Sequence, residues 1–124
     1  MAAVSPDAGI IEAGGVTFAV EHRHFGGDKG PAIRVLGDVN GVQVQLLRFD
    51  CFENDPHYHY DPDGMNVVLH MSPQFDTASW SADHIERNLK TMVKLAGYPE
   101  VAELIDPTAV QEAMPAIRRA MRGN

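Results

Sequence analysis

The side chains best suited to catalysis or ligand binding gather in residues 50–63. That segment contains five carboxylates, two histidines and two tyrosines, and a further histidine, His70, follows it closely. Imidazole nitrogens and carboxylate oxygens together are ligands for Zn²⁺, Fe²⁺, Mn²⁺ or Ni²⁺. A histidine beside a carboxylate can also act as an acid–base pair without a metal. The segment is therefore the candidate site of the chain.

His57 and His59 have the spacing that best supports a shared ligand. On a β-strand, residues two apart point to the same face and lie about 6.6–7 Å apart along the chain. Their two imidazoles can therefore converge on one metal ion. Whether His70 joins them depends on the turn predicted at 61–64, where Asp, Pro and Gly stand in the order typical of a β-turn.

Two registers are open at this turn. In a four-residue loop, Tyr60 opposes Met65, and both Asp55 and His70 share a face with the other two histidines. In a three-residue loop with a bulge, His70 points to the opposite face. The turn residues favour the shorter loop and the apolar alternation favours the longer one. Burial sets register more strongly than turn type, so we expect the four-residue loop.

These patterns support the hypothesis of a small metal-binding protein, either an enzyme or a binding protein. The expected metal ligands are His57, His59, His70, Asp55 and Asp50, the two carboxylates being alternative oxygen donors. The expected proton donors are Tyr58 and Tyr60. The expected cofactor is a divalent transition metal such as Zn, Fe, Mn or Ni.

Two other interpretations compete with the metal hypothesis. In the first, the segment is an amphipathic strand whose tyrosines point inward and whose imidazoles lie in water. In the second, the hairpin and the last helix form a non-catalytic interaction module that binds another protein or a second copy of the chain. The expected partner is accordingly a small molecule or a protein, and a homo-oligomer is compatible with the pattern.

The first half of the chain has the alternation of β-strands. Val16, Phe18 and Val20 alternate with more polar residues, as in a half-buried strand. The segment 39–42, Val-Asn-Gly-Val, predicts a two-residue type I′ hairpin, because both central residues must accept a positive φ. Its dry face is expected to pack under a helix. Apolar residues change parity after Leu46, which indicates a bulge or a second covered face there.

The second half has helical spacing. The stripe of Ile85, Leu89, Met92 and Val93 predicts one helix with an N-cap at Thr77, Ser79 or Ser81. A short helix is expected from 99 to 105, and Asp106 is expected to cap the last helix. We therefore expect an α+β fold, with an N-terminal antiparallel sheet built from hairpins and covered on one face by two or three C-terminal helices. Residues 1–15 are expected to form a flexible arm. Residues 16–124 are expected to form one domain, with the sheet in 16–72 and the helices in 77–122.

Composition narrows the class of protein. The formal charge of −7, from 17 acidic and 10 basic residues, makes a nucleic-acid partner unlikely, because Lys and Arg supply most phosphate binding. No apolar run approaches the roughly 20 residues that a membrane helix needs, so no membrane partner is expected. Residues 1–9 show no secretory signal pattern. A single cysteine, Cys51, suits a reducing compartment, and we expect a cytoplasmic protein.

One longer pattern resembles a known group of proteins. Arg48-Phe49-Asp50-Cys51-Phe52, followed by Pro56-His57-Tyr58-His59-Tyr60, is similar to a segment of small uncharacterised bacterial proteins of unknown function. The resemblance covers about residues 20–64. It implies a bacterial origin and carries no activity with it.

Overall fold

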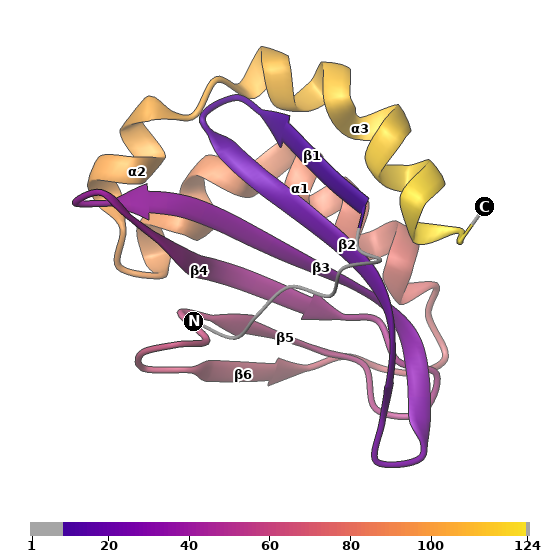
Figure 1. Ribbon diagram of the computed structural model, residues 1–124. Coiled ribbons are helices and arrows are strands. Elements are labelled where there is room, and N and C mark those ends of the chain that lie inside the picture. The colour runs from indigo at the N-terminus through magenta and orange to yellow at the C-terminus, as the bar shows by residue number, and fades with distance from the viewer. Residues whose placement is uncertain (1–8, 124) are drawn as a thin grey trace.

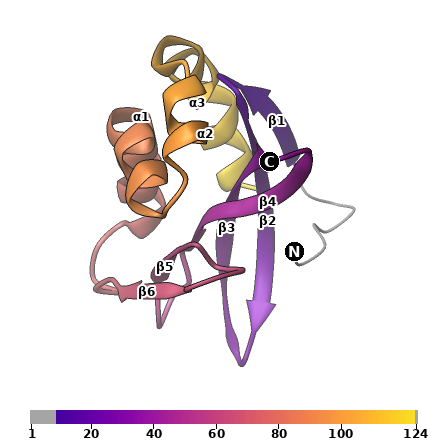
Figure 2. The same cartoon turned by 90° about the vertical axis from the view of Figure 1, so that its left-hand side faces the viewer.

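The computed structural model describes residues 9–123 as an antiparallel six-stranded sheet followed by three helices (Figure 1). The strands are β1 (Gly9–Ala13), β2 (Val16–Phe25), β3 (Asp28–Val39), β4 (Val42–Asp50), β5 (His57–Tyr60) and β6 (Val67–His70). The helices are α1 (Thr77–Leu95), α2 (Pro99–Leu104) and α3 (Pro107–Met121). All three helices lie on one side of the sheet (Figure 2). The predicted α+β fold is confirmed.

The strands follow one another across the sheet in chain order, β1 to β6. Each strand therefore forms a hairpin with the next one along the chain. The sheet face that packs on the helices carries the core, and we call the opposite face the open face. None of the helices within residues 9–123 is long and apolar enough to cross a bilayer.

The sheet begins earlier than predicted. β1 pairs with β2 from Gly9 opposite Val20 to Ala13 opposite Val16, so the expectation of a flexible arm over residues 1–15 is wrong from residue 9 onward. Residues 1–8 lie outside the described part of the chain. The signal in the sequence is Gly14-Gly15, both at positive φ, which is turn chemistry suited to a two-residue hairpin.

The hairpin between β3 and β4 is confirmed. Val39 opposes Val42, and Asn40 and Gly41 have φ of 53° and 83°. Val35 opposes Leu47 while Leu36 opposes Gln45, which leaves the residue between them, Leu46, unpaired in a bulge. The bulge places two consecutive leucines in the core, and both are fully buried. The predicted irregularity near Leu46 is therefore a real one.

The helices bury the stripes that the sequence predicts, including Ile85, Leu89, Met92 and Val93 of α1. The cap of α1 differs from the prediction: the carboxylate of Asp76, not a later Ser or Thr, accepts a hydrogen bond from Ser79 N. α3 begins after the predicted cap, Asp106, and is one continuous helix through its internal proline.

The hairpin β5–β6 departs from the expected register by two residues. Tyr60 opposes Val67, and His57 opposes His70. The connection is longer than four residues because Asp61 folds the chain onto itself: its carbonyl accepts hydrogen bonds from the amides of Gly64 and Asn66. A shift by two residues preserves parity, so the predicted faces are unchanged. His70 still lies on the face of the other histidines.

Candidate functional site

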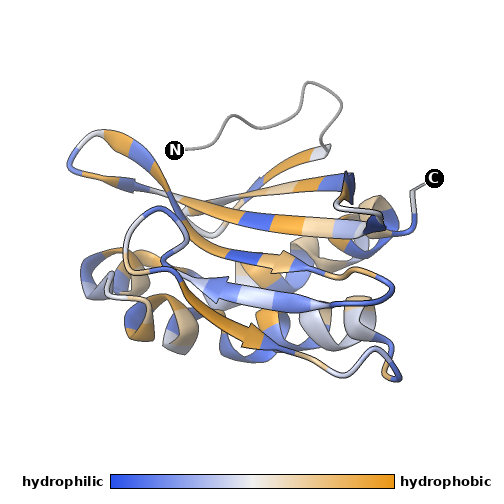
Figure 3. Cartoon of the chain, turned by 90° about the horizontal axis from the view of Figure 1, so that it is seen from below, coloured by the Kyte–Doolittle hydropathy of each residue, from blue (hydrophilic) through white to orange (hydrophobic). Residues whose placement is uncertain are grey.

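The candidate site lies on the open face, where β4, β5 and β6 run side by side. Asp50 opposes His57 and His57 opposes His70, so the three form one row across the strands. Arg48 and His59 are opposite one another in the next row. Figure 3 shows the setting: β5 is hydrophilic along its length, whereas β6 is mostly apolar.

Asp50 is the centre of this arrangement and is fully buried. Arg23 Nη1 donates to Oδ1 over 2.8 Å, and Arg48 Nε donates to Oδ2 over 3.0 Å. His57 Nε2 and His59 Nε2 also face Oδ2, at 3.2 and 3.3 Å. Burial by itself raises the pKa of Asp50, but His59 and the two guanidinium groups outweigh it and hold that pKa well below its ordinary value. The carboxylate is therefore ionised at neutral pH.

The two imidazoles are held by their other ring nitrogens. His57 Nδ1 lies 2.8 Å from the carbonyl oxygen of Asp55, and His59 Nδ1 lies 2.6 Å from Oδ1 of Asn66. Because both partners are acceptors, the Nδ1 atoms carry the protons, and in a neutral ring Nε2 has a lone pair. On His59 this lone pair accepts a hydrogen bond from Arg48 Nη2 over 3.0 Å. Metal-binding histidines are commonly oriented in this way.

The distances around Asp50 Oδ2 fit a shared ion. Ligand atoms about 2.1 Å from one ion, at angles between about 90° and 109°, lie about 2.9–3.4 Å from one another. The two Nε2–Oδ2 distances, 3.2 and 3.3 Å, fall in that range. The same distances suit hydrogen bonds from protonated imidazoles. The geometry therefore accepts either protons or a metal ion between these atoms.

A second group shares His57. It consists of Asp55, His57 and His70, and its ligand atoms also lie within 4.8 Å of one another. His70 Nδ1 is 2.9 Å from Asp55 Oδ1, and both of these side chains are exposed. The predicted single site of three histidines is thus divided: one group is buried around Asp50, and the other lies at the surface beside Asp55.

Tyr58 and Tyr60, predicted as proton donors, point to the opposite face of the sheet. Tyr58 stacks on Phe49, with 5.5 Å between ring centroids, and lies 5.4 Å from the ring of Trp80 on α1. Burial raises the pKa of both tyrosines. The structure does not bring either hydroxyl to the histidines, so these side chains belong to the packing between β5 and the core.

Three members of the site are absent from the predicted set: Arg48, Arg23 and Asn66. Arg23 comes from β2, 27 residues before Asp50, and only the folded sheet brings the two together. Asn66, which holds His59, has a φ of 51° at the end of the β5–β6 connection. Asn tolerates this conformation better than most residues. An Asn after the predicted turn could therefore have indicated that the connection extends to residue 66. Arg23 had no such signal.

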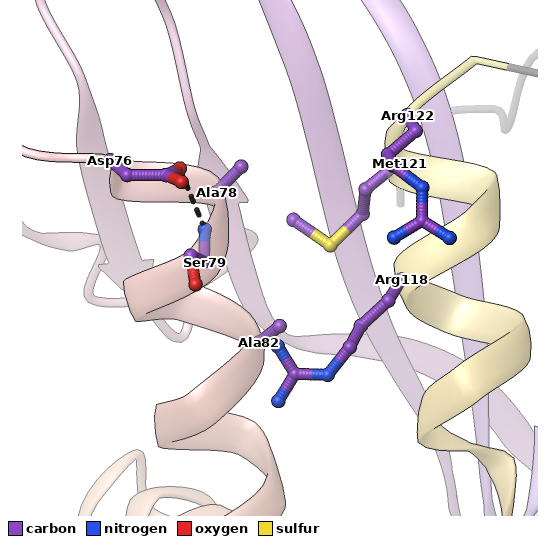
Figure 4. Close-up of a pocket in the computed structure, with 7 residues that line it drawn as sticks. All are labelled: Asp76, Ala78, Ser79, Ala82, Arg118, Met121 and Arg122. Atoms are coloured by element: carbon purple, nitrogen blue, oxygen red, sulfur yellow. Dashed lines mark hydrogen bonds between the residues drawn. The ribbon is translucent and has the colours of Figure 1, made fainter.

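The cavity between the start of α1 and the end of α3 is a separate feature (Figure 4). It has a volume of about 230 Å³. Two of its charged side chains have structural partners: Asp76 caps α1, and Arg118 binds Asp83 over 2.7 Å. Arg122 also lines it. This cavity is best explained as packing between two helices.

Comparison with known families supports one part of the resemblance, that to proteins of unknown function. A family described as a domain of unknown function (DUF7700) matches residues 10–121. The chain belongs to this family. Both histidine groups of this DUF7700 domain lie within the matched range. No curated protein and no solved structure matches the chain.

Proposed function

We propose that this domain binds one divalent transition-metal ion, Zn²⁺, Fe²⁺, Mn²⁺ or Ni²⁺, between His57, His59 and Asp50. The observation that carries the proposal is the convergence of two Nε2 atoms on one carboxylate oxygen, with both Nδ1 atoms held by acceptors. Two imidazoles and one carboxylate form a ligand set that leaves coordination positions open for water or a substrate.

The arginines both help and oppose this role. Arg23 and Arg48 keep Asp50 ionised, so the carboxylate needs no proton release before it binds an ion. They also place two positive charges beside the ion. We propose that Arg48, which is partly exposed, leaves both Asp50 Oδ2 and His59 Nε2 when the ion binds, while Arg23 keeps its bond to Oδ1.

Cys51 is not part of the proposed ligand set although it follows Asp50 directly. It packs in the core on the helix side of the sheet, and burial raises the pKa of its thiol to about 11. A thiol must lose its proton to bind a metal, so this cysteine stays protonated and structural. A buried free cysteine suits a reducing environment, and we propose a bacterial cytoplasm as the setting of the domain.

Calorimetric titration of tag-free protein with each of the four ions, under anaerobic conditions for Fe²⁺, tests the proposal. We expect one ion per chain, binding that weakens as the pH is lowered because protons compete for the ligand atoms, and a rise in melting temperature that a chelator reverses. The double variant His57→Ala/His59→Ala should lose binding. The matched control His22→Ala/His84→Ala removes two histidines outside both groups and should bind as the wild type does.

Two results would count against the proposed site. Equal binding by the wild type and the His57→Ala/His59→Ala variant would place any metal elsewhere. Binding that is lost in His70→Ala but kept in His59→Ala would assign the ion to the exposed group of Asp55, His57 and His70 instead.

Self-association is a second candidate function, and the outer edge of the sheet favours it. β6 is the last strand, and Val67, Val68 and Leu69 are all exposed. Unprotected apolar edge strands can pair with a strand of another chain. Sedimentation velocity across a range of concentrations should then show a dimer that Val68→Lys disrupts; a monomer at all concentrations contradicts this candidate.

A further inference from the structure

A second open depression lies on the helix side of the same hairpin, between β6 and the first turns of α1. Leu69 lines it from the strand, Phe75 from the connection and Trp80 from the helix, and Tyr58 lies beneath. Its volume is about 720 Å³, within the usual range of sites for small molecules. We call it the aromatic groove.

Two large aromatic side chains of the aromatic groove are exposed to solvent. Phe75 is 71% exposed and Trp80 is 39% exposed. Trp80 is nevertheless fixed, because its ring lies 5.4 Å from that of Tyr58 and 4.8 Å from that of His84. Exposed large apolar side chains gathered around a hollow are typical of a binding site.

Charge decides which ligand suits the groove. Asp76 and Asp83 line it, and no lysine or arginine among the described residues does. Asp83 Oδ1 accepts a hydrogen bond from the charged side chain of Arg118, whereas Asp76 Oδ1 accepts from the backbone amide of Ser79. Asp76 is therefore the stronger source of negative potential. The whole chain has a net charge of −7. Carboxylates and aromatic faces both attract cations.

We propose that the aromatic groove binds a small organic amine, a protonated ammonium group attached to an apolar ring or chain. The apolar part of the ligand packs on Phe75 and Leu69, and its ammonium group lies between the face of Trp80 and the carboxylate of Asp76. A carboxylate or phosphate ligand is disfavoured by the same charges. His70 of the exposed histidine group also lines the groove. The contacts proposed for the ligand include none of His57, His59 and Asp50, so the proposal does not depend on metal binding at that site.

Trp80 provides the measurement, because it is the only tryptophan in the chain. Its fluorescence is titrated with three probes of similar size, 2-phenylethylamine, 2-phenylethanol and phenylacetate, in the presence of a chelator. The pH is held at 8 in all titrations. We expect a saturable change with the amine, and an affinity at least tenfold weaker for the alcohol and the carboxylate.

Two variants with matched controls assign the binding to this groove. Asp76→Asn removes the charge but keeps a good helix cap, and should weaken the amine at least fivefold while leaving the alcohol unchanged. Asp106→Asn makes the same change at the cap of α3 and should have no effect. Phe75→Ala should weaken all three probes, whereas Leu104→Ala, which removes an equally exposed apolar side chain elsewhere, should not.

The outcomes that overturn the proposal are distinct from those of the metal experiment. Equal affinity for the amine and phenylacetate would show that the acidic groups do not select the ligand. No saturable fluorescence change with any probe up to millimolar concentration, or unchanged amine affinity in Phe75→Ala, would show that the groove does not bind this class of molecule.

Discussion

Asp50 stays ionised on the side of the sheet away from the helices although no water reaches it. Four nitrogens from four side chains surround its two oxygens. Breaking a buried ion pair by removing one partner is costly, because the remaining charges lose their compensation. The carboxylate therefore stabilises the fold whether or not a metal binds.

We predict that Asp50→Asn lowers the free energy of unfolding by about 3–5 kcal/mol, because Arg23 and Arg48 would face a neutral group. The native pKa of Asp50 is below its unfolded value, so its contribution is complete above about pH 5 and is lost as the pH falls. Denaturant melts at pH 5 and pH 3, in the presence of a chelator, measure both the loss of stability in the variant and its dependence on pH. The wild type should lose more stability across this interval than the variant.

Asp55→Asn serves as the control for that experiment. The carboxylate of Asp55 is exposed and pairs with the exposed His70, so its neutralisation should cost less than about 1 kcal/mol. If both variants behave alike, Asp50 does not have the buried, doubly paired environment described above.

For single residues, the sequence predicts on which face of the sheet a side chain lies, but not which side chains from other strands it contacts. The alternation of His57 and His59 was enough to place both imidazoles on one face, and the structure confirms it. The sequence could not indicate that Arg23 would meet Asp50, because that contact depends on the twist and register of two intervening strand pairs.

Among the elements, helix α1 buries an apolar stripe in the core. Leu89 is central to its buried stripe and is 3% exposed. We predict that Leu89→Ala destabilises the protein by about 2–5 kcal/mol, the usual range for a buried leucine. Urea melts provide the measurement. Leu95→Ala, at the exposed end of the same helix, is the matched control; a loss below about 1 kcal/mol for Leu89 would place it outside the core.

The turn whose conformation depends on its own residue types was predictable from the sequence. The connection whose length depends on several alternative hydrogen bonds was not. The turn at Asn40-Gly41 follows from two residues that accept positive φ. The β5–β6 connection also begins with a strong turn pattern. The predicted length of this connection was nevertheless wrong. Asp61 adopts a positive φ, and its carboxylate accepts a hydrogen bond from the amide of Met65. Propensity alone does not rank such a loop against a tight turn.

For the whole molecule, three helices on one side leave the open face to polar groups. The helix side contains the continuous apolar core, while the open face holds the ion-paired network around Asp50. The separation of helices and strands along the chain was sufficient to predict this two-layer arrangement. It also explains why one hairpin, β5–β6, carries both a polar group of histidines and an aromatic groove, one on each face.

The position of β5–β6 at the end of the sheet has a consequence for amide hydrogen exchange. β6 pairs with β5 alone, and all four of its residues are exposed. Segments with few buried contacts open without global unfolding. We predict that amides of Val67–His70 exchange much faster than those of β3, and that Leu89→Ala accelerates exchange in β3 while leaving β6 unchanged. Exchange followed by mass spectrometry would measure this, and equal acceleration in both strands would mean that the hairpin opens only when the entire domain unfolds.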